Sequence, residues 1–506
     1  MSQNHESEVQ DHKRDRLDQI YDELAGSGDI VIQTIKVGKE EPKRGFHILM
    51  CSGMVDMQTV FIALLPQLDK LAENLNKDAG QQEQAEDEQI ENKQEPVTME
   101  KNHMHKVGCS FGARLSLDND REVAYFFSSL YSGSVITVDE ITRSVYTFDI
   151  ASVPGRQPEE STMELSIKGP RDGFVEKIST NIALIRRRLR TPDLYVEYSK
   201  IGTETQTEVS MMYMRNKAKP SLVKEARKRL EAIHIEALYS SSELEELVSD
   251  RPDSLFPLVD YIGRPDYVVQ ALMQGRVCLL VDGNPSVIIL PGNLTLLVKS
   301  PEDAHLPYYF VSLERLLRFI GFILAICLPG FWVALSAYNT DQIPFTLLAT
   351  VTNSRIGLPI SATMEMFLMM AMFELFREAG VRLPRPVGQT VSVVGGLIIG
   401  DAAIRAGITS PTMLVAAAVT AVSTFTLVNQ TLSGTVSILR FFVLILSSIF
   451  GILGFFVSVF MILIYMCSLE TFNQNYMQPI APIQWRELVT SLFQKPWKSR
   501  VKGEKP

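Results

Sequence analysis

Hydrophobic residues are distributed unevenly along the chain, and the C-terminal half contains three long stretches without a charged residue or histidine. These stretches are residues 319–338, 406–439 and 441–469. Each reaches the ~20 apolar residues that a helix needs to cross a bilayer. The pattern predicts an integral membrane protein and excludes a wholly soluble enzyme.

Four segments of this half are long enough to be full spans, namely residues 319–338, 358–376, 411–432 and 438–465. A fifth segment, residues 387–400, is short and rich in Gly and hydroxyl side chains. Short elements at membrane depth persist only where protein or water surrounds them. We therefore expect an all-α transmembrane bundle of four spans plus one re-entrant segment.

Basic residues flank these spans in a pattern that orients them. Arg315 and Arg318 precede the first span, Arg377, Arg382 and Arg385 follow the second, and the tail from residue 486 is rich in Lys and Arg. Because Lys and Arg near span ends favour the cytoplasmic side, all three flanks are expected there. An even number of crossings satisfies this requirement. The alternative is five crossings with an extracellular tail.

The N-terminal half alternates between the hydrophobic periods of strands and helices. Residues 46–50 have the pattern of a buried strand, and residues 56–75 have an apolar helical face. The alternation resumes after Pro154, so we predict a two-part α/β domain, which is expected to be cytoplasmic because no apolar export signal precedes it. The predicted organisation is a polar N-terminal extension (1–40), a first α/β subdomain (41–152) with a disordered acidic insertion (78–101), a second α/β subdomain (153–305), the transmembrane domain (306–470) and a basic cytoplasmic tail (471–506).

Composition narrows the possible functions. The 506 residues carry a formal net charge of −9, so nucleic acid is not an expected partner. The five cysteines are scattered, which predicts neither a disulfide framework nor a metal site and fits a reducing compartment. His103, His105 and Cys109 are a remote metal-binding alternative. No P-loop, GxSxG or HExxH motif occurs, so we expect neither an enzyme nor a cofactor.

Two carboxylates, Glu365 and Glu374, fall within the second predicted span. A carboxylate at the bilayer centre costs about 2.5–3.5 kcal/mol on insertion scales, so both should face protein or water. For Glu374, an ion pair with Arg377 at i+3 is the simpler explanation. For Glu365, which lies deeper, a functional or inter-subunit role and a purely structural role both remain open.

The segment before and including Asp401 has the composition of an ion path. Its candidate pore residues are Thr390, Val391, Ser392, Val394, Gly396, Gly400 and Asp401. Hydroxyls, exposed backbone and a carboxylate suit a cation path, and valines can form a gate that closes by dewetting. A single chain supplies one such segment, so a pore requires several copies around an axis. The alternative is close helix packing at the Gly396 and Gly400 spacing.

A polar motif in the soluble half precedes an arginine-rich helix. We list Arg171, Asp172, Glu176, Arg264 and Asp266 as candidate interface or coupling residues. The simpler explanation is structural: a turn, a helix N-cap at Asp172 and a solvated basic face over residues 186–190.

Several sequence motifs together resemble one family. They are Gly-Pro-Arg-Asp-Gly-Phe-Val-Glu at 169–176 before Asn181, Arg-Pro-Asp at 264–266, Val-Asp-Gly-Asn-Pro at 281–285, and Phe-Glu-Leu-Phe-Arg-Glu-Ala-Gly-Val-Arg-Leu-Pro-Arg-Pro-Val-Gly-Gln-Thr at 373–390. From about residue 40 onward the chain closely resembles the A subunits of the GerA family of spore germinant receptors. It departs from the family in the acidic insertion and in residues 300–307, which lack an expected Glu-Asp-Tyr-Tyr run.

The resemblance implies a receptor subunit of the spore inner membrane that triggers germination when nutrients are sensed. It further implies assembly with a polytopic B subunit and a C lipoprotein, contact with membrane lipid, and a homo-oligomeric, pentameric ion channel. Two other functions are considered. In a secondary transporter, Glu365 and Asp401 would carry protons or coupling ions, although we find no internal repeat among the spans. A scaffold for a sensing partner would conduct no ions by itself.

Overall fold

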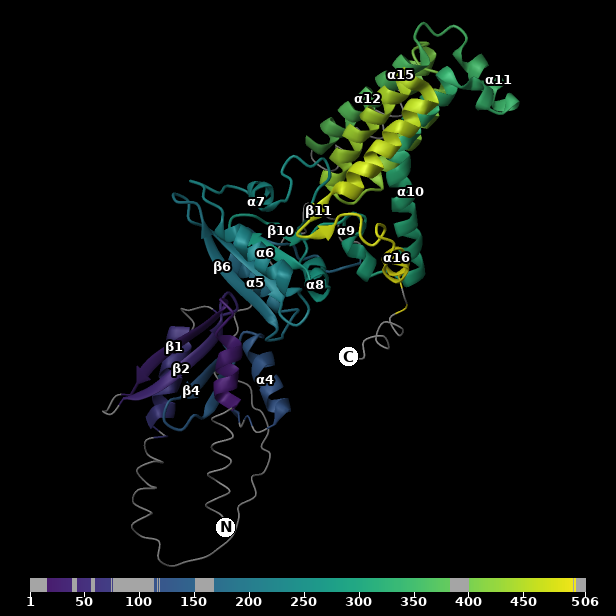
Figure 1. Ribbon diagram of the computed structural model, residues 1–506. Coiled ribbons are helices and arrows are strands. Elements are labelled where there is room, and N and C mark those ends of the chain that lie inside the picture. Colours follow the sequence, from purple (N-terminus) through teal and green to yellow (C-terminus); the bar gives the residue numbers. More distant parts are fainter. Residues whose placement is uncertain are drawn as a thin grey trace, which may run out of the picture. The chain divides into compact units, whose positions relative to one another are not determined.

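The computed structural model describes residues 16–38, 43–55, 60–73, 75, 113–115, 117, 119–150, 168–382, 400–494 and 496. The chain divides into two compact units. The first comprises residues 1–165, 170–244 and 262–289, and the second comprises residues 166–169, 245–261 and 290–506. Figure 1 shows sheets with flanking helices in the first unit and a bundle of long helices in the second.

The first sheet has five strands in the order β1-β2-β4-β5-β3. Its strands are β1 (Ile30–Val37), β2 (Arg44–Cys51), β3 (Ala113–Leu115), β4 (Val135–Asp139) and β5 (Val145–Phe148), and their neighbours pair antiparallel. The side chains of β2 alternate between two cores, as the period of a strand dictates. Leu49 and Cys51 pack with α4 (Asp120–Leu130), whereas Ile48 and Met50 pack against the helical residues that follow η1 (Val60–Leu64).

The N-terminal residues belong to this sheet layer. Residues 16–24 are helical, and Leu17, Ile20 and Leu24 are buried in the same core as α4. The edge strand β1 follows directly and pairs with β2 along its whole length. The expected polar extension over residues 1–40 therefore contributes a helix and a strand to the first unit, because its few apolar residues are spaced for one buried helix face.

The second sheet has the strand order β6-β7-β9-β10-β8. Its strands are β6 (Leu194–Ile201), β7 (Thr207–Met214), β8 (Asp260–Ile262), β9 (Val277–Val281) and β10 (Val287–Leu290), with helices α5 (Ile178–Arg186), α6 (Pro220–Glu231), α7 (Ser241–Val248) and α8 (Pro265–Met273). Every residue of β9 and β10 is buried, as expected for central strands covered on both faces. The predicted pairing of two sheet-and-helix parts is thus present.

The second unit is mainly helical. Its elements are α9 (Leu294–Leu297), η2 (Pro301–Ala304), α10 (Tyr308–Val333), η3 (Ala334–Tyr338), η4 (Thr340–Gln342), α11 (Phe345–Arg355), α12 (Ala362–Arg382), α14 (Pro411–Phe425), α15 (Gln430–Ser468), β11 (Glu470–Thr471), β12 (Gln474–Asn475) and α16 (Trp485–Leu492). Two stretches, Tyr308–Tyr338 and Gln430–Ser468, are long and apolar enough to cross a membrane. Helices α10, α12 and α15 lie side by side in the bundle (Figure 1).

The segment α15 is a helical hairpin and not one straight helix. Gly451 has φ 63° and ψ −137°, a conformation that other residues rarely adopt. Thr435 donates a hydrogen bond to the carbonyl of Leu255, while the Tyr465 hydroxyl accepts one from the amide of the same residue. In a straight helix the two positions would be ~45 Å apart. The prediction of one span over residues 438–465 is therefore wrong, because the chain reverses at Gly451.

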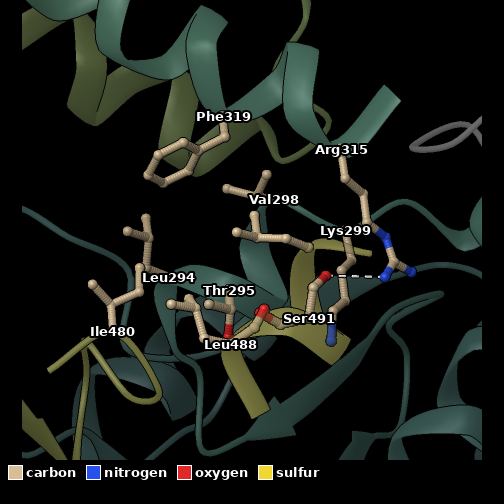
Figure 2. Close-up of a pocket in the computed structure, with 10 residues that line it drawn as sticks. Leu294, Thr295, Val298, Lys299, Arg315, Phe319, Ile480, Leu488 and Ser491 are labelled. Carbon is tan, nitrogen blue, oxygen red and sulfur yellow. Dashed lines mark hydrogen bonds between the residues drawn. The ribbon is translucent and has the colours of Figure 1, made fainter. Parts of the chain in front are cut away.

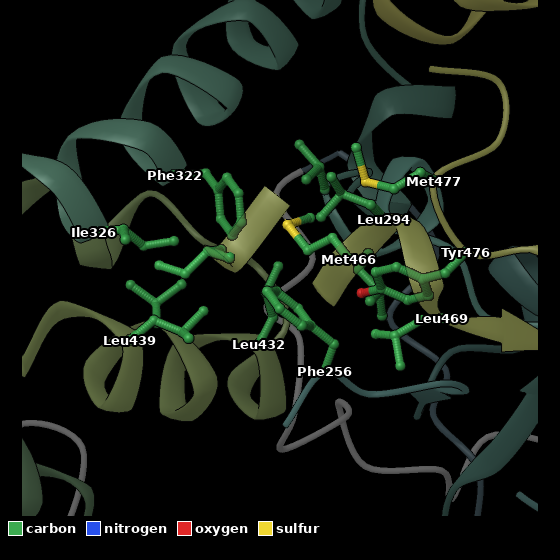
Figure 3. Packing of buried hydrophobic residues seen from close by; sticks show 14 of the residues in the cluster. Phe256, Leu294, Phe322, Ile326, Leu432, Leu439, Met466, Leu469, Tyr476 and Met477 are labelled. Atoms are coloured by element: carbon green, nitrogen blue, oxygen red, sulfur yellow. The ribbon is translucent and has the colours of Figure 1, made fainter. Parts of the chain in front are cut away.

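The two arms of this hairpin enclose a common core. Figure 3 shows Leu439 of the first arm beside Ile326 of α10, and Leu432 of the first arm near Phe256 and Met466 of the second arm, all in one cluster that also includes Tyr476. A carboxamide supports the turn from outside, since Asn339 Oδ1 accepts a hydrogen bond from the amide of Ile452 at 3.3 Å. Burial of the apolar faces of both arms in one cluster is what holds them antiparallel.

Two contacts at opposite ends of α12 show in which direction it runs relative to α14. At one end of the bundle, Glu365 near the start of α12 contacts Ser410 before α14; at the other end, Arg377 of α12 contacts Ser433 of α15. Helices α12 and α14 therefore run parallel. The predicted re-entrant segment, residues 387–400, falls outside the described residues except for Gly400.

The chain enters and leaves the bundle at the same end. Arg315, near the start of α10, donates to the carbonyl of Ser491 in α16 at 3.0 Å. The arginine flank of α10 and helix α16 therefore lie at the same end of the bundle, and the choice between four and five crossings stays a prediction.

Candidate functional site

A charged cluster lies between α12 and α15 inside the bundle. The Arg440 side chain is only 4% exposed, and its guanidinium donates to Glu374 at 2.9 Å and to the hydroxyl of Ser437 at 3.0 Å. Glu374 also pairs with Arg377, three residues further along α12. The ion pair predicted from the i, i+3 spacing is thus present, and a second arginine from another helix joins it.

This cluster lies deep along the bundle axis. Leu439, next to Arg440, packs in the same core as Ile326 of α10. The rise from Arg318, the last charged residue before the apolar part of α10, to Ile326 is roughly 12 Å at 1.5 Å per residue, so Arg440 lies about that far along the bundle from the arginine flank of α10.

A cavity of ≈ 710 Å³ adjoins the cluster. Its described lining residues are Phe373, Glu374, Phe376, Arg377, Gly400, Asp401, Ile404, Leu414, Ala418, Ala421, Val422, Thr424, Phe425 and Arg440. The polar groups of this lining meet an otherwise largely apolar wall; they belong to Glu374, Arg377, Asp401, Thr424 and Arg440. Such a space can hold water beside fixed charges, which an ion path through a bundle needs.

The charges of the cluster do not cancel. Glu374 supplies one negative charge, whereas Arg377 and Arg440 each supply a positive charge. Within the described part of the chain, Nε of Arg440 has no hydrogen-bond partner. A buried donor without a partner costs about 1–3 kcal/mol, and polar groups retained at such a cost inside a membrane bundle are typical of functional positions.

Glu365 lies near the start of α12, at the end of this helix away from Glu374, and links it to neighbouring helices. Its side chain is fully buried, and Oε1 accepts hydrogen bonds from the hydroxyl of Thr409 at 2.9 Å and from both the hydroxyl and the amide of Ser410. Ser410 is the N-cap of α14, so the carboxylate lies where the helix dipole favours negative charge. Arg355 approaches the other oxygen at 3.8 Å. This geometry supports a structural role in joining α11, α12 and α14.

Of the candidate pore residues, the structure describes only the last two. Thr390, Val391, Ser392, Val394 and Gly396 lie outside the described residues, as do His103, His105 and Cys109. Gly400 packs close to Leu414 of α14, and Asp401 forms an exposed i, i+4 ion pair with Arg405 at 2.8 Å. Both line the cavity of the charged cluster. Among the described residues, no group of three or more His, Cys, Asp or Glu side chains could hold a metal ion.

The polar motif of the soluble half forms a network of backbone contacts. The side chain of Asn181 accepts a hydrogen bond from the amide of Val175 and donates one to the carbonyl of the same residue. The carbonyl of Glu176 accepts a hydrogen bond from the amide of Gly283 at 2.8 Å. The N-cap prediction for Asp172 is wrong, because Asp282 accepts from the amide of Ile178 at the start of α5, and Asp172 instead pairs with Arg188 at 2.5 Å. The sequence could not reveal a cap supplied from so far along the chain.

The other candidate interface or coupling residues of the N-terminal half are of two kinds, exposed and buried. The side chains of Arg171 and Glu176 are exposed. Arg264 and Asp266 form a buried bidentate pair at 3.1 and 2.7 Å. Their contacts account for local structure, and an additional role as interface or coupling residues stays a prediction.

The predicted solvated basic face over residues 186–190 is wrong at its first position. Arg186 is completely buried, donates to both oxygens of Asp29 at 2.6 and 2.9 Å, and lies 4.5 Å from the ring centroid of Tyr131. Asp29 precedes β1 of the first sheet, whereas Arg186 ends α5 beside the second. This ion pair therefore joins the two sheets, and the run of arginines in the sequence concealed it.

Sequence reasoning also missed Arg440. A lone arginine between apolar runs of 34 and 29 residues signals a buried partner, and the carboxylates of the second predicted span, Glu365 and Glu374, were the candidates.

Comparison with known proteins places this bundle and its soluble unit in a family. Residues 18–505 match the model of the Bacillus/Clostridium GerA spore germination protein family. The chain is 44% identical over 391 residues to spore germination protein XA of Bacillus anthracis, covering 77% of this chain and 79% of that protein. It is 32% identical over 475 residues to spore germination protein KA of Bacillus subtilis (strain 168), covering 94% and 83%.

The chain therefore belongs to the GerA family of spore germination proteins, which confirms the resemblance found in its motifs. A solved structure, the N-terminal domain of the A subunit of the Bacillus megaterium spore germinant receptor GerK3, is 29% identical in sequence. It covers 54% of this chain and 92% of its own length, with a TM-score of 0.35.

Proposed function

We propose that this chain is the A subunit of a nutrient germinant receptor of the spore inner membrane, and that several copies form an ion channel that opens when nutrient is sensed. The observation that supports this most directly is the charged cluster of Glu374, Arg377 and Arg440 beside a pocket that opens at the surface of an apolar bundle. A buried arginine and two half-buried charged groups next to such a space are what an ion path needs and what a passive anchor would avoid.

The proposed membrane arrangement has both flanks in the cytoplasm. Helices α10, α12, α14 and the two arms of α15 each pass along the bundle. We propose that each of these five segments crosses the membrane and that residues 387–400 remain the candidate pore segment. The positive-inside bias of Arg315, Arg318 and the tail then places the N-terminal unit in the cytoplasm.

The pore itself would be lined by Thr390, Val391, Ser392, Val394 and Gly396 from each copy, followed by Gly400 and Asp401. The position of Gly400 and Asp401 beside the cavity of the charged cluster favours continuity between the two. A homo-oligomer, pentameric as the family resemblance implies, would place these segments around one axis. The B and C subunits of the receptor would assemble with it, and the B subunit would bind the nutrient, as the family resemblance implies.

Reconstitution tests this function. Full-length chain in nanodiscs is sized by native mass spectrometry, and potassium flux is measured from proteoliposomes against protein-free vesicles. The channel proposal predicts a mass that is a whole multiple of the 56.7 kDa chain and flux above the vesicle background. A scaffold predicts no flux at any stoichiometry. A transporter predicts flux that saturates with substrate and depends on a proton or sodium gradient.

A further inference from the structure

A second, smaller pocket lies within the second unit, apart from the charged cluster. It has a volume of ≈ 210 Å³ and is lined by Leu294, Thr295, Val298, Lys299, Arg315, Phe319, Ile480, Leu488, Ser491 and Leu492. These residues come from α9, the start of α10, the segment after β12, and α16. We refer to it as the α9–α16 pocket.

The lining of this pocket is amphiphilic. In Figure 2, Leu294 and Ile480 lie on one side with Phe319 above them, and the cationic ends of Arg315 and Lys299 lie on the other side. The only charged groups among its described lining residues are these two cations. An occupant that fits has an apolar chain and an anionic head.

The pocket lies where a membrane surface would be. Phe319 is the first residue of the charge-free run of α10, directly after Arg315 and Arg318. Helix α16 carries apolar residues at 485, 488, 489 and 492, which form one stripe of a helix, and Phe493 follows directly after its end. Leu488 and Leu492 face the pocket, whereas Trp485, Val489 and Phe493 are 72%, 47% and 50% exposed. Such a helix, with an exposed Trp, is typical of the bilayer interface.

The size of the pocket fits part of an acyl chain. A dry apolar cavity of about 150 Å³ binds benzene, so ≈ 210 Å³ accommodates roughly eight carbons. A whole lipid tail is longer, and the rest of it would remain in the bilayer beside the exposed face of α16.

We propose that the α9–α16 pocket binds one acyl chain of an anionic phospholipid, with Lys299 and Arg315 near its headgroup. Arg315 also donates to Asp303 at 2.7 Å and to the carbonyl of Ser491, so its guanidinium is held in place beside the pocket. The bound lipid would fasten α16 to α9 and α10 at the cytoplasmic surface. This inference rests on the membrane position of α10 and is independent of any ion path.

Photo-crosslinking of the purified full-length chain tests the proposal. The probe is phosphatidylglycerol with a diazirine in one acyl chain, compared with phosphatidylcholine carrying the same group, and labelled peptides are located by mass spectrometry. The expected label falls on peptides containing residues 294–299 or 488–492. Label confined to other peptides, or equal labelling by the two lipids, would overturn the proposal.

Matched variants strengthen the test. Thr295→Phe fills the pocket and should abolish most labelling at these peptides, whereas Thr490→Phe makes the same change on α16 outside the pocket lining and should retain it. Lys299→Glu should lower phosphatidylglycerol labelling about fivefold and leave phosphatidylcholine unchanged. If Thr295→Phe does not fold, the labelling of the Lys299→Glu variant by the two lipids tests the proposal instead. Equal labelling of the Thr295 and Thr490 variants, or no effect at Lys299, would contradict a lipid in this pocket.

Discussion

The guanidinium of Arg440 and the carboxylate of Glu374 meet at 2.9 Å between two helices of an otherwise apolar bundle. Neither residue has the side chain that a membrane helix would carry for packing alone. Glu374 also pairs with Arg377. All three residues line the same cavity as Gly400 and Asp401.

Removal of the negative charge should weaken the bundle. Glu374→Gln leaves two arginines without their carboxylate, and loss of one partner from a buried pair costs 3–5 kcal/mol. Because Glu374 is 28% exposed, we expect a smaller loss of about 2 kcal/mol. Thermal unfolding of the full chain in detergent measures it. The control Arg405→Gln breaks an exposed pair and should change stability by less than about 0.5 kcal/mol; equal effects would show that the cluster is not stabilising.

Loss of the Asp29–Arg186 ion pair between the two sheets should destabilise the protein more than loss of the Glu374 charge. Asp29→Asn leaves Arg186 fully buried without its counter-charge, and we expect a loss of about 3–5 kcal/mol in the stability of the first unit. Asp18→Asn, which removes an exposed partner of Arg143, is the matched control and should be nearly neutral. Denaturant unfolding followed by far-ultraviolet circular dichroism distinguishes the two variants. A nearly neutral Asp29 variant would mean that the sheets do not depend on this contact.

The same pair has a defined pH dependence. Burial raises the pKa of the Asp29 carboxyl, but the Arg186 guanidinium and hydrogen bonds outweigh it, so the pKa lies below its ordinary value. A lowered pKa gives stability that is present above the unfolded pKa of about 3.9 and is lost as pH falls through the folded pKa. The stability difference between wild type and Asp29→Asn should therefore stay constant from about pH 7 to pH 5 and shrink only below about pH 4. A difference that already shrinks above pH 5 would contradict a lowered pKa.

The turn of the α15 hairpin should tolerate only glycine. At Gly451 a Cβ would approach Cβ of Tyr338 to 3.0 Å, and the backbone has a positive φ. Gly451→Ala should cost about 1–3 kcal/mol. Gly434→Ala, in the first arm with open space around it, should be neutral or stabilising by up to about 1 kcal/mol. The apparent melting temperatures of the two variants in detergent provide the measurement, and a neutral Gly451 variant would argue against the reversal.

The hydrophobic pattern was sufficient to predict the two-part architecture but not its long-range contacts. Residues 438–465 contain no polar turn, so a single span was the natural interpretation; the positive φ of Gly451 and the contacts of Thr435 and Tyr465 with Leu255 reveal the reversal. Periodicity identified α5, yet its last residue, Arg186, pairs with Asp29 at a separation of 157 residues. Such partners depend on how the sheets pack, which local pattern does not encode.

The most direct test of the account is potassium flux from proteoliposomes that contain full-length chain with a polar residue in the proposed gate. Val394→Ser should make an apolar constriction easier to wet and raise basal flux. Val415→Ser makes the same change at an exposed position of α14 outside the cavity lining and should leave flux at the wild-type level. Higher flux in the Val394 variant alone would support an ion path through this segment. Identical flux in wild type and both variants would contradict it.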